Sequence, residues 1–209
     1  MVSSKGEQKQ LYDWMLSREW DVFGTLKFQP IRLTSGQHCH KVLKRYWNKL
    51  DRVIYGKAAE KGFRVERWCL AHEGSHNDNY HVHFAVKSPI DHDLFCCLSN
   101  TLWTKQDRIT CSINRNWITP ALHRDRVANY LTKEVWKLGG GSFDAELSFE
   151  QHVPFELNDG RRTAQELRVA RAMSSNEDRA ARMALVKHKA ETLRRLALRD
   201  QKKSGKATF

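Results

Sequence analysis

The chain has 209 residues, a hydrophobic fraction of 40% and a formal net charge of +12, which allow one domain with a sizeable core and an appendage. Its apolar runs are too short to span a bilayer, and residues 1–12 lack the apolar segment of a secretory signal. Five cysteines without zinc-type CxxC pairs are typical of thiols in a reducing compartment. We therefore expect a cytoplasmic protein, and neither a membrane protein nor a secreted disulfide scaffold.

The excess positive charge is concentrated towards the C-terminal end of the chain. Residues 161–209 hold 14 Lys and Arg against 5 Asp and Glu, a net of +9, whereas residues 1–160 hold 22 against 19, a net of +3. A basic segment attracts a polyanion by releasing counterions, although basic helices also serve solubility alone. The charge favours nucleic acid as a partner.

The first predicted strand covers residues 20–28, where apolar and polar side chains alternate. A helix follows, with Thr34 or Ser35 as its N-cap and apolar residues at helical spacing over several turns. Two further strands, at 63–73 and 81–87, are separated by a segment rich in turn residues. The two are therefore expected to form a hairpin.

Two more helices and a fourth strand are predicted after this hairpin. Asp91 is a suitable N-cap for the first helix, and residues 108–113 are predicted as the strand. Pro120 opens the second helix, which carries an apolar stripe and ends at the GGGS sequence, residues 139–142.

The resulting order, β-α-β-β-α-β-α, predicts an α+β fold. We expect an antiparallel sheet of four to five strands with helices mainly on one face, as in ferredoxin-like and RRM domains. Residues 1–142 would form this domain, 143–160 a linker, and 161–209 a basic extension with helices at 163–173 and 176–200.

The predicted hairpin carries a candidate metal site. His81 and His83 are one residue apart on a strand, so both imidazoles point to the same face. A symmetric turn over residues 74–80 would place Glu73 opposite His81 and Ala71 opposite His83. One carboxylate and two imidazoles with open coordination positions suit Mg²⁺ or Mn²⁺, or else Zn²⁺.

The His-x-His pattern alone is weak evidence, because it arises easily by chance. His38 and His40 form a second such pattern at a predicted helix start, where side chains two residues apart diverge. The alternative for the hairpin is a solvated turn with incidental histidines. We interpret His72 and His76 as residues of that turn.

Tyr130 and Lys133 form a candidate nucleophile pair. They are three residues apart on a predicted helix and therefore neighbours on one flank. The ordinary pKa of a tyrosine hydroxyl is about 10, so nucleophilic attack at neutral pH requires stabilisation of the phenolate. An adjacent ammonium group provides it. The alternative is a tyrosine at the edge of the core beside a solvated lysine.

Taken together, three motifs resemble the HUH endonuclease superfamily, specifically its single-tyrosine replication initiators of the Rep type. FGTLKF (23–28) is similar to the first motif, a strand with Thr25 near its middle. HVHFAV (81–86) matches the second motif, and YLTK (130–133) matches the third. Glu73 lies where many members place a third metal ligand.

The resemblance implies an activity and a role for each site residue. Glu73, His81 and His83 would hold Mg²⁺ or Mn²⁺ against the scissile phosphate. Tyr130 would attack phosphorus to give a 5′-phosphotyrosine and a free 3′-OH, with Lys133 orienting the phosphate or stabilising the phenolate. Because the ester conserves the bond energy, the strand can be nicked and rejoined.

The resemblance, which covers about residues 18–138, also implies partners. The substrate would be single-stranded DNA or an origin hairpin of a phage or plasmid, in the cytoplasm of a bacterial host cell. The chain lacks a GxxxxGK[ST] phosphate loop, so the helicase and polymerase of the host replication machinery would act in trans. Only one tyrosine occurs in the third motif, which argues against a two-tyrosine scheme.

Other residues are candidates for DNA contact. Lys27, Arg64, Arg67 and Trp68 suit phosphate pairing and base stacking, with solvated charge or sheet packing as the alternative for each. The amphipathic helix at 176–200 would bind duplex DNA or support self-association with another protomer.

Three competing functions remain open at this point. One is a single-tyrosine transposase or relaxase of the same superfamily. A second is a non-catalytic RRM-like module that binds nucleic acid through an aromatic sheet face. A third is a metal-dependent nuclease that uses water and forms no covalent intermediate.

Overall fold

The computed structural model describes residues 5–29, 35–72, 80–106, 116–137, 143–156 and 158–173. The chain runs in order through α1 (Lys5–Ser17), β1 (Val22–Lys27), α2 (Gly36–Tyr55), the 3-10 helix η1 (Gly56–Lys61), β2 (Arg67–His72), β3 (His81–Val86), α3 (His92–Thr104), β4 (Trp117–Pro120), α4 (Arg124–Lys137) and α5 (Asp159–Ala172). Within these ranges, no helix combines the length and apolar character needed to cross a membrane.

The four strands form one antiparallel sheet with the order β2-β3-β1-β4. This confirms the α+β class and the β-α-β-β-α-β order of a ferredoxin-like core. Two predicted helix starts are also confirmed. Ser35 accepts a hydrogen bond from the backbone N–H of His38, and Asp91 accepts one from Leu94, as N-caps do.

The fourth strand differs from the prediction. Residues 117–120 pair with β1, with Pro120 opposite Val22, and α4 begins only at Arg124. The prediction that Pro120 opens a helix is therefore wrong. Proline is tolerated here because it is the last residue of a strand at the edge of the sheet. The strand predicted at 108–113 lies outside the described residues.

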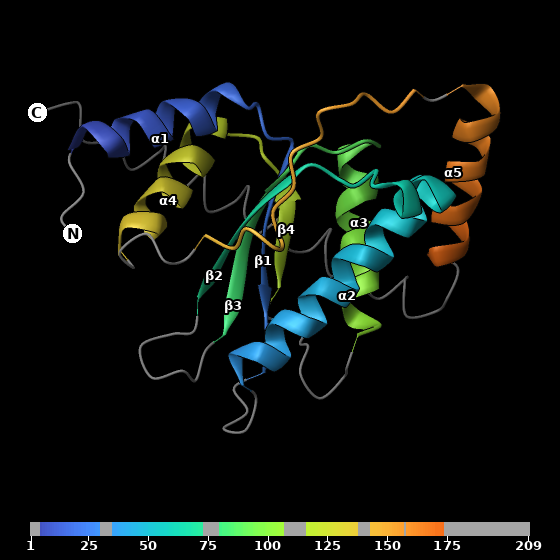
Figure 1. Ribbon diagram of the computed structural model, residues 1–209, viewed down its shortest axis with the longest axis horizontal. Coiled ribbons are helices and arrows are strands. Elements are labelled where there is room, and N and C mark those ends of the chain that lie inside the picture. Colours follow the sequence, from blue (N-terminus) through green and yellow to red (C-terminus); the bar gives the residue numbers. More distant parts are fainter. Residues whose placement is uncertain are drawn as a thin grey trace, which may run out of the picture.

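Helices cover both faces of the sheet (Figure 1). The larger core lies between the sheet and α2 and α3, with α5 packed on the outer side of these helices, and its bulkiest members are Trp47, Trp103, Tyr46, Phe84 and Phe95. A second core lies between the other face and α1 and α4, and includes Met15, Trp20, Phe23, Trp68, Leu70, Ala85, Leu131 and Val135. Helix α1 was absent from the sequence prediction, and with α4 it closes the sheet face that an RRM domain leaves open.

Strand β1 has a glycine, Gly24, where it packs against the larger core. A Cβ atom added to Gly24 would lie 2.3 Å from Cζ of Phe84 and 3.0 Å from the carbonyl oxygen of Trp117. Only glycine therefore lets the buried Phe84 ring pass this close to the strand.

Residues 143–149, the edge segment, run beside β2, which is one edge of the sheet. Antiparallel bridges join Phe149 to Arg67 and Phe143 to Leu70. Covering an edge in this way satisfies strand groups that would otherwise be open to pairing with another chain. Part of the segment predicted as a linker is thus packed against the sheet.

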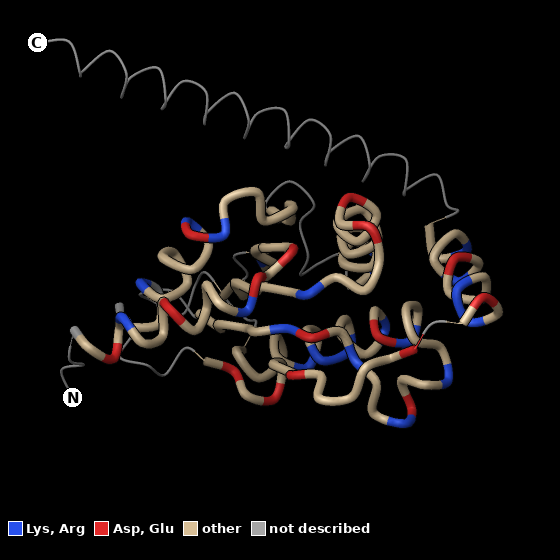
Figure 2. The backbone as a smooth tube through the Cα atoms, turned by 90° about the horizontal axis from the view of Figure 1, so that it is seen from above, with Lys and Arg blue, Asp and Glu red and all other residues tan. Residues whose placement is uncertain are grey.

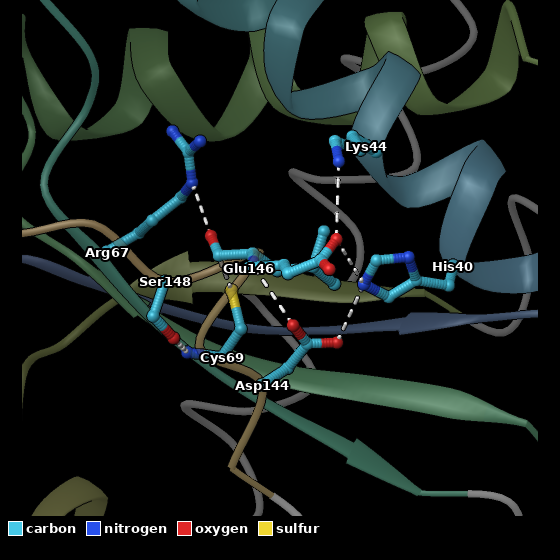
Figure 3. A network of polar contacts seen from close by, with 8 residues as sticks. His40, Lys44, Arg67, Cys69, Asp144, Glu146 and Ser148 are labelled. Carbon is cyan, nitrogen blue, oxygen red and sulfur yellow. Dashed lines mark hydrogen bonds and ion pairs between the residues drawn. The ribbon is translucent and has the colours of Figure 1, made fainter.

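Side chains hold the edge segment at both ends (Figure 3). The backbone N–H of Cys69 donates to Ser148 Oγ at 3.0 Å, and the N–H of Asp144 donates to the Cys69 carbonyl at 3.0 Å. Nε2 of His40, on α2, lies 3.2 Å from Asp144 Oδ2. The edge segment therefore connects β2 with α2.

Arg67, predicted as a DNA contact, is instead a buried structural residue with 3% exposure. Its Nη1 lies 2.9 Å from Asp51 Oδ1 on α2 and donates to the Val65 carbonyl, while its Nε donates to the Leu147 carbonyl at 2.8 Å. The guanidinium also lies 4.7 Å from the Trp47 ring centroid. Burial raises the pKa of the Asp51 carboxyl, and Arg67 opposes that shift.

Helix α5 packs onto the domain and extends the larger core. Val169 and Met173 are buried in it, and Gln165 Nε2 and Arg168 Nη2 both donate to the carbonyl of Ile54 near the end of α2. Basic and acidic residues are interspersed over the described elements (Figure 2). The helix predicted at 176–200 lies outside the described residues.

Asp51→Ala is expected to lower the free energy of unfolding by about 3–5 kcal/mol, because it leaves the buried Arg67 guanidinium without its carboxylate. The matched control is Asp13→Ala, which removes an exposed i,i+4 ion pair with Lys9 and should cost about 0.5 kcal/mol. Urea unfolding measures both changes. Similar small losses for the two variants would contradict the role assigned to the buried pair.

Candidate functional site

Three strands bring histidines and a threonine to one face of the sheet, the face of the second core. In the β2–β3 register His72 is opposite His81 and Leu70 is opposite His83. In the β1–β3 register Thr25 is opposite His83. Directly paired residues share a face, so His72, His81, His83 and Thr25 lie together.

The predicted pairing across the hairpin is therefore wrong by one residue. His72, rather than Glu73, faces His81, and Ala71 faces Val82 on the opposite side of the sheet. His72 is the last residue of β2 and only 4% exposed, so it is not a turn residue. Glu73 itself lies outside the described residues, as does the rest of the turn through residue 79.

The three imidazoles of this face are close together. The ring centroids of His72 and His81 are 4.9 Å apart with nearly parallel planes, and His83 lies 5.0 Å from His72 and 4.9 Å from His81. Across the described ranges, no group of three or more His, Cys, Asp or Glu side chains has an arrangement able to hold a metal ion. Two of the three predicted ligands, His81 and His83, lie within the described residues, and the structure brings them together.

His83 is held through both of its ring nitrogens. Thr25 Oγ1 lies 2.8 Å from Nδ1, and the hydroxyl oxygen of Tyr130 lies 3.2 Å from Nε2. Thr25 and His83 are each 5% exposed, whereas Tyr130 is 41% exposed. A buried imidazole therefore lies between a buried hydroxyl and an accessible phenol.

Tyr130 reaches the histidines because α4 packs over this face. Leu131 and Val135, two residues of the predicted apolar stripe, are buried in the second core together with Ala128. The Tyr130 ring centroid lies 5.1 Å from that of His83 and 5.7 Å from that of Phe23. The helix thus leaves the phenol at the rim of the core, where one side remains open to solvent.

Lys133 and Lys27 flank this arrangement. Lys133 is exposed on α4, three residues after Tyr130. Lys27 is the last residue of β1, opposite His81 in the register, and is partly exposed. Of the four predicted DNA contacts, Lys27 lies at the histidine end of the sheet.

The other predicted DNA contacts lie elsewhere and pack against the protein. Trp68 is 8% exposed, and its ring lies 5.9 Å from Trp14 and 5.7 Å from Phe143. Arg64 lies with its guanidinium 5.8 Å from the Phe149 ring. Trp68 is therefore a packing residue, which is one of the two alternatives that the sequence offered. Arg64 remains partly accessible.

Cys69, whose side chain lies on the opposite face of β2, is a buried and unreactive thiol. Burial raises the pKa of its thiol to about 12, so the thiolate needed for nucleophilic attack is not populated at neutral pH. Tyr130, in contrast, combines access to solvent with a histidine neighbour.

Comparisons with known proteins add no relatives to this picture. No family model matches the chain, and neither the curated proteins nor the solved structures searched contain a significant match.

His72→Ala tests the observed register. The substitution is expected to lower the free energy of unfolding by about 1–3 kcal/mol, because His72 is buried against two other imidazoles. His152→Ala, at an exposed position, should change it by no more than about 0.5 kcal/mol. If chemical denaturation shows His72→Ala to be as neutral as the control, His72 belongs to the turn after all.

Proposed function

We propose that this protein is a single-tyrosine HUH-type endonuclease that nicks and rejoins single-stranded DNA at a replication origin, as the initiator of rolling-circle replication in a phage or plasmid. One observation carries the proposal. Tyr130, on α4, and His83, on β3, are 47 positions apart in the chain, yet their hydroxyl and Nε2 lie 3.2 Å apart. The second and third motifs therefore meet in space, as a joint catalytic site requires.

Of the three predicted cation ligands, the structure describes His81 and His83, whereas Glu73 lies outside the described residues. His81 and His83 present imidazoles on one face, and Glu73, in the segment between the two strands, would supply a carboxylate. Such a mixed nitrogen and oxygen set suits Mn²⁺ and also admits Mg²⁺. When bound, the cation would withdraw charge from the scissile phosphate and orient it.

The remaining steps belong to the side chains of the protein. In the protein without a cation, a hydrogen bond to His83 Nε2 holds the Tyr130 oxygen beside the histidine pair. A cation bound at Nε2 would replace this hydrogen bond. The Lys133 ammonium favours loss of the phenolic proton to solvent. The phenolate oxygen then bonds to phosphorus, the bond from phosphorus to the 3′ oxygen breaks, and the 3′ oxygen takes up a proton. The products are a 5′-phosphotyrosine and a free 3′-OH, which can reverse the reaction.

The fold argues against the RRM-like alternative. That function needs an open sheet face whose aromatic side chains stack on bases. In the described part of the chain both faces are covered by helices, and Phe23 and Trp68 are buried beneath α1 and α4. An accessible tyrosine hydroxyl beside a buried histidine is the arrangement that a nicking enzyme needs.

Tyr130→Phe is expected to abolish the covalent adduct with a labelled single-stranded oligonucleotide in the presence of Mn²⁺, because the attacking oxygen is missing. Denaturing electrophoresis measures the adduct. Tyr55→Phe is the matched control: burial raises the pKa of the Tyr55 hydroxyl, which makes it a poor nucleophile, and this variant should retain the adduct.

Each other outcome of this experiment points to a different reaction. An adduct that persists in Tyr130→Phe would exclude Tyr130 as the nucleophile. Cleavage by the unaltered protein without any adduct would indicate a nuclease that uses water. Preference for paired transposon-end hairpins over origin oligonucleotides would select a transposase.

A further inference from the structure

We infer that Thr25 is a positioning residue whose hydroxyl accepts a hydrogen bond from Nδ1–H of His83 and so makes Nε2 the nitrogen that carries the lone pair. The inference deepens the proposed function and rests on it for its catalytic meaning. The underlying contact, 2.8 Å between Thr25 Oγ1 and His83 Nδ1, is a property of the fold.

The bonding capacity of the imidazole links its two nitrogens. A neutral imidazole has one N–H donor and one lone-pair acceptor, and the hydrogen bond made by one nitrogen fixes the role of the other. If Nδ1 donates to Thr25, Nε2 faces Tyr130 with its lone pair available. That lone pair can accept the phenol hydrogen bond in the unloaded protein and would serve a cation as ligand.

The surrounding structure holds the His83 ring firmly. Thr25 and His83 are register partners on adjacent strands, so the sheet fixes the distance between their backbones. The Phe23 ring is stacked nearly parallel to the imidazole, at 14° between the planes and 6.3 Å between the centroids. Backbone pairing, stacking and the hydroxyl together leave the His83 ring little freedom to rotate.

A buried hydroxyl at position 25 costs free energy unless it is hydrogen-bonded. Thr25 is 5% exposed, and a buried hydroxyl is tolerated only when it is hydrogen-bonded. Valine has nearly the same shape and an equal preference for strands, and would fill the position without that requirement. The hydroxyl is therefore explained by its bond to His83 more readily than by packing.

The test uses three variants of the full chain. Thr25→Val removes the hydroxyl at almost constant shape, Thr25→Ser retains it, and Thr119→Val is the matched control. Thr119 is a strand threonine on β4 whose register partner is Phe23. Thermal unfolding of all three establishes that each variant is folded before other properties are compared.

The first readout is independent of activity. Long-range proton–nitrogen NMR correlations of the His83 ring, assigned with His83→Gln, are recorded at about pH 8, where an ordinary imidazole is neutral. We expect Nδ1 to be protonated and Nε2 to be unprotonated in the unaltered protein and in Thr25→Ser. Thr25→Val should lose this preference. A proton on Nε2 in the unaltered protein overturns the inference.

The second readout is the rate of adduct formation. Thr25→Val should lower it by about 10–100-fold, as loss of such supporting hydrogen bonds does at related sites, with oligonucleotide affinity unchanged. Thr25→Ser and Thr119→Val should stay close to the unaltered protein. If Thr25→Val forms the adduct at the normal rate, the inference fails while the proposed function stands. If the unaltered protein forms none, the proposed function fails and the NMR result still decides the role of Thr25.

Discussion

The buried ion pair between Arg67 and Asp51 is the constraint on which the rest of the structure depends. Arg67 is the first residue of β2, and its guanidinium joins that strand to α2 through Asp51 and to the edge segment through the Leu147 carbonyl. A shift of β2 by one residue would turn every side chain to the other face of the sheet. It would withdraw Arg67 from Asp51 and turn His72 away from His81, so the ion pair fixes the strand orientation that the histidine face requires.

The two faces of the sheet differ: one carries the larger core, and the other carries the candidate site. The larger core, with α2, α3 and α5 on one side of the sheet, contains the largest fully buried aromatic rings, among them Trp47, Trp103 and Tyr46. The other face has a smaller core under α1 and α4, and at its edge the exposed Tyr130 lies beside the buried His83. Residues on strands hold their positions more rigidly than residues on loops, and α4 adds one accessible side chain to that rigid base.

The sequence was sufficient for the α+β class, three of the four strands, the caps at Ser35 and Asp91, and the meeting of Tyr130 with the histidine pair. It failed where a short-range rule competed with a long-range contact. The predicted pairing of β2 with β3 assumed a symmetric turn, which is a local rule. The observed register follows from long-range packing, because Trp68 and Leu70 enter one core and Cys69 enters the other. Arg67 looked like a surface cation because its partner Asp51 lies on another element, which alternation within a strand cannot reveal.

The contrast in exposure along Thr25, His83 and Tyr130 explains why the site needs a sheet and a helix together. The imidazole is buried, so it is sheltered from competing water and keeps one orientation, and its supporting hydroxyl is equally buried. The phenol is 41% exposed, which the proposed attack on a DNA strand would require. If the phenol and the imidazole were both on paired strand positions, they would share a face of the sheet. Both would then be buried or both exposed. Placing Tyr130 on α4, above the rim of the sheet, separates the two requirements while keeping the phenol within hydrogen-bond reach of His83.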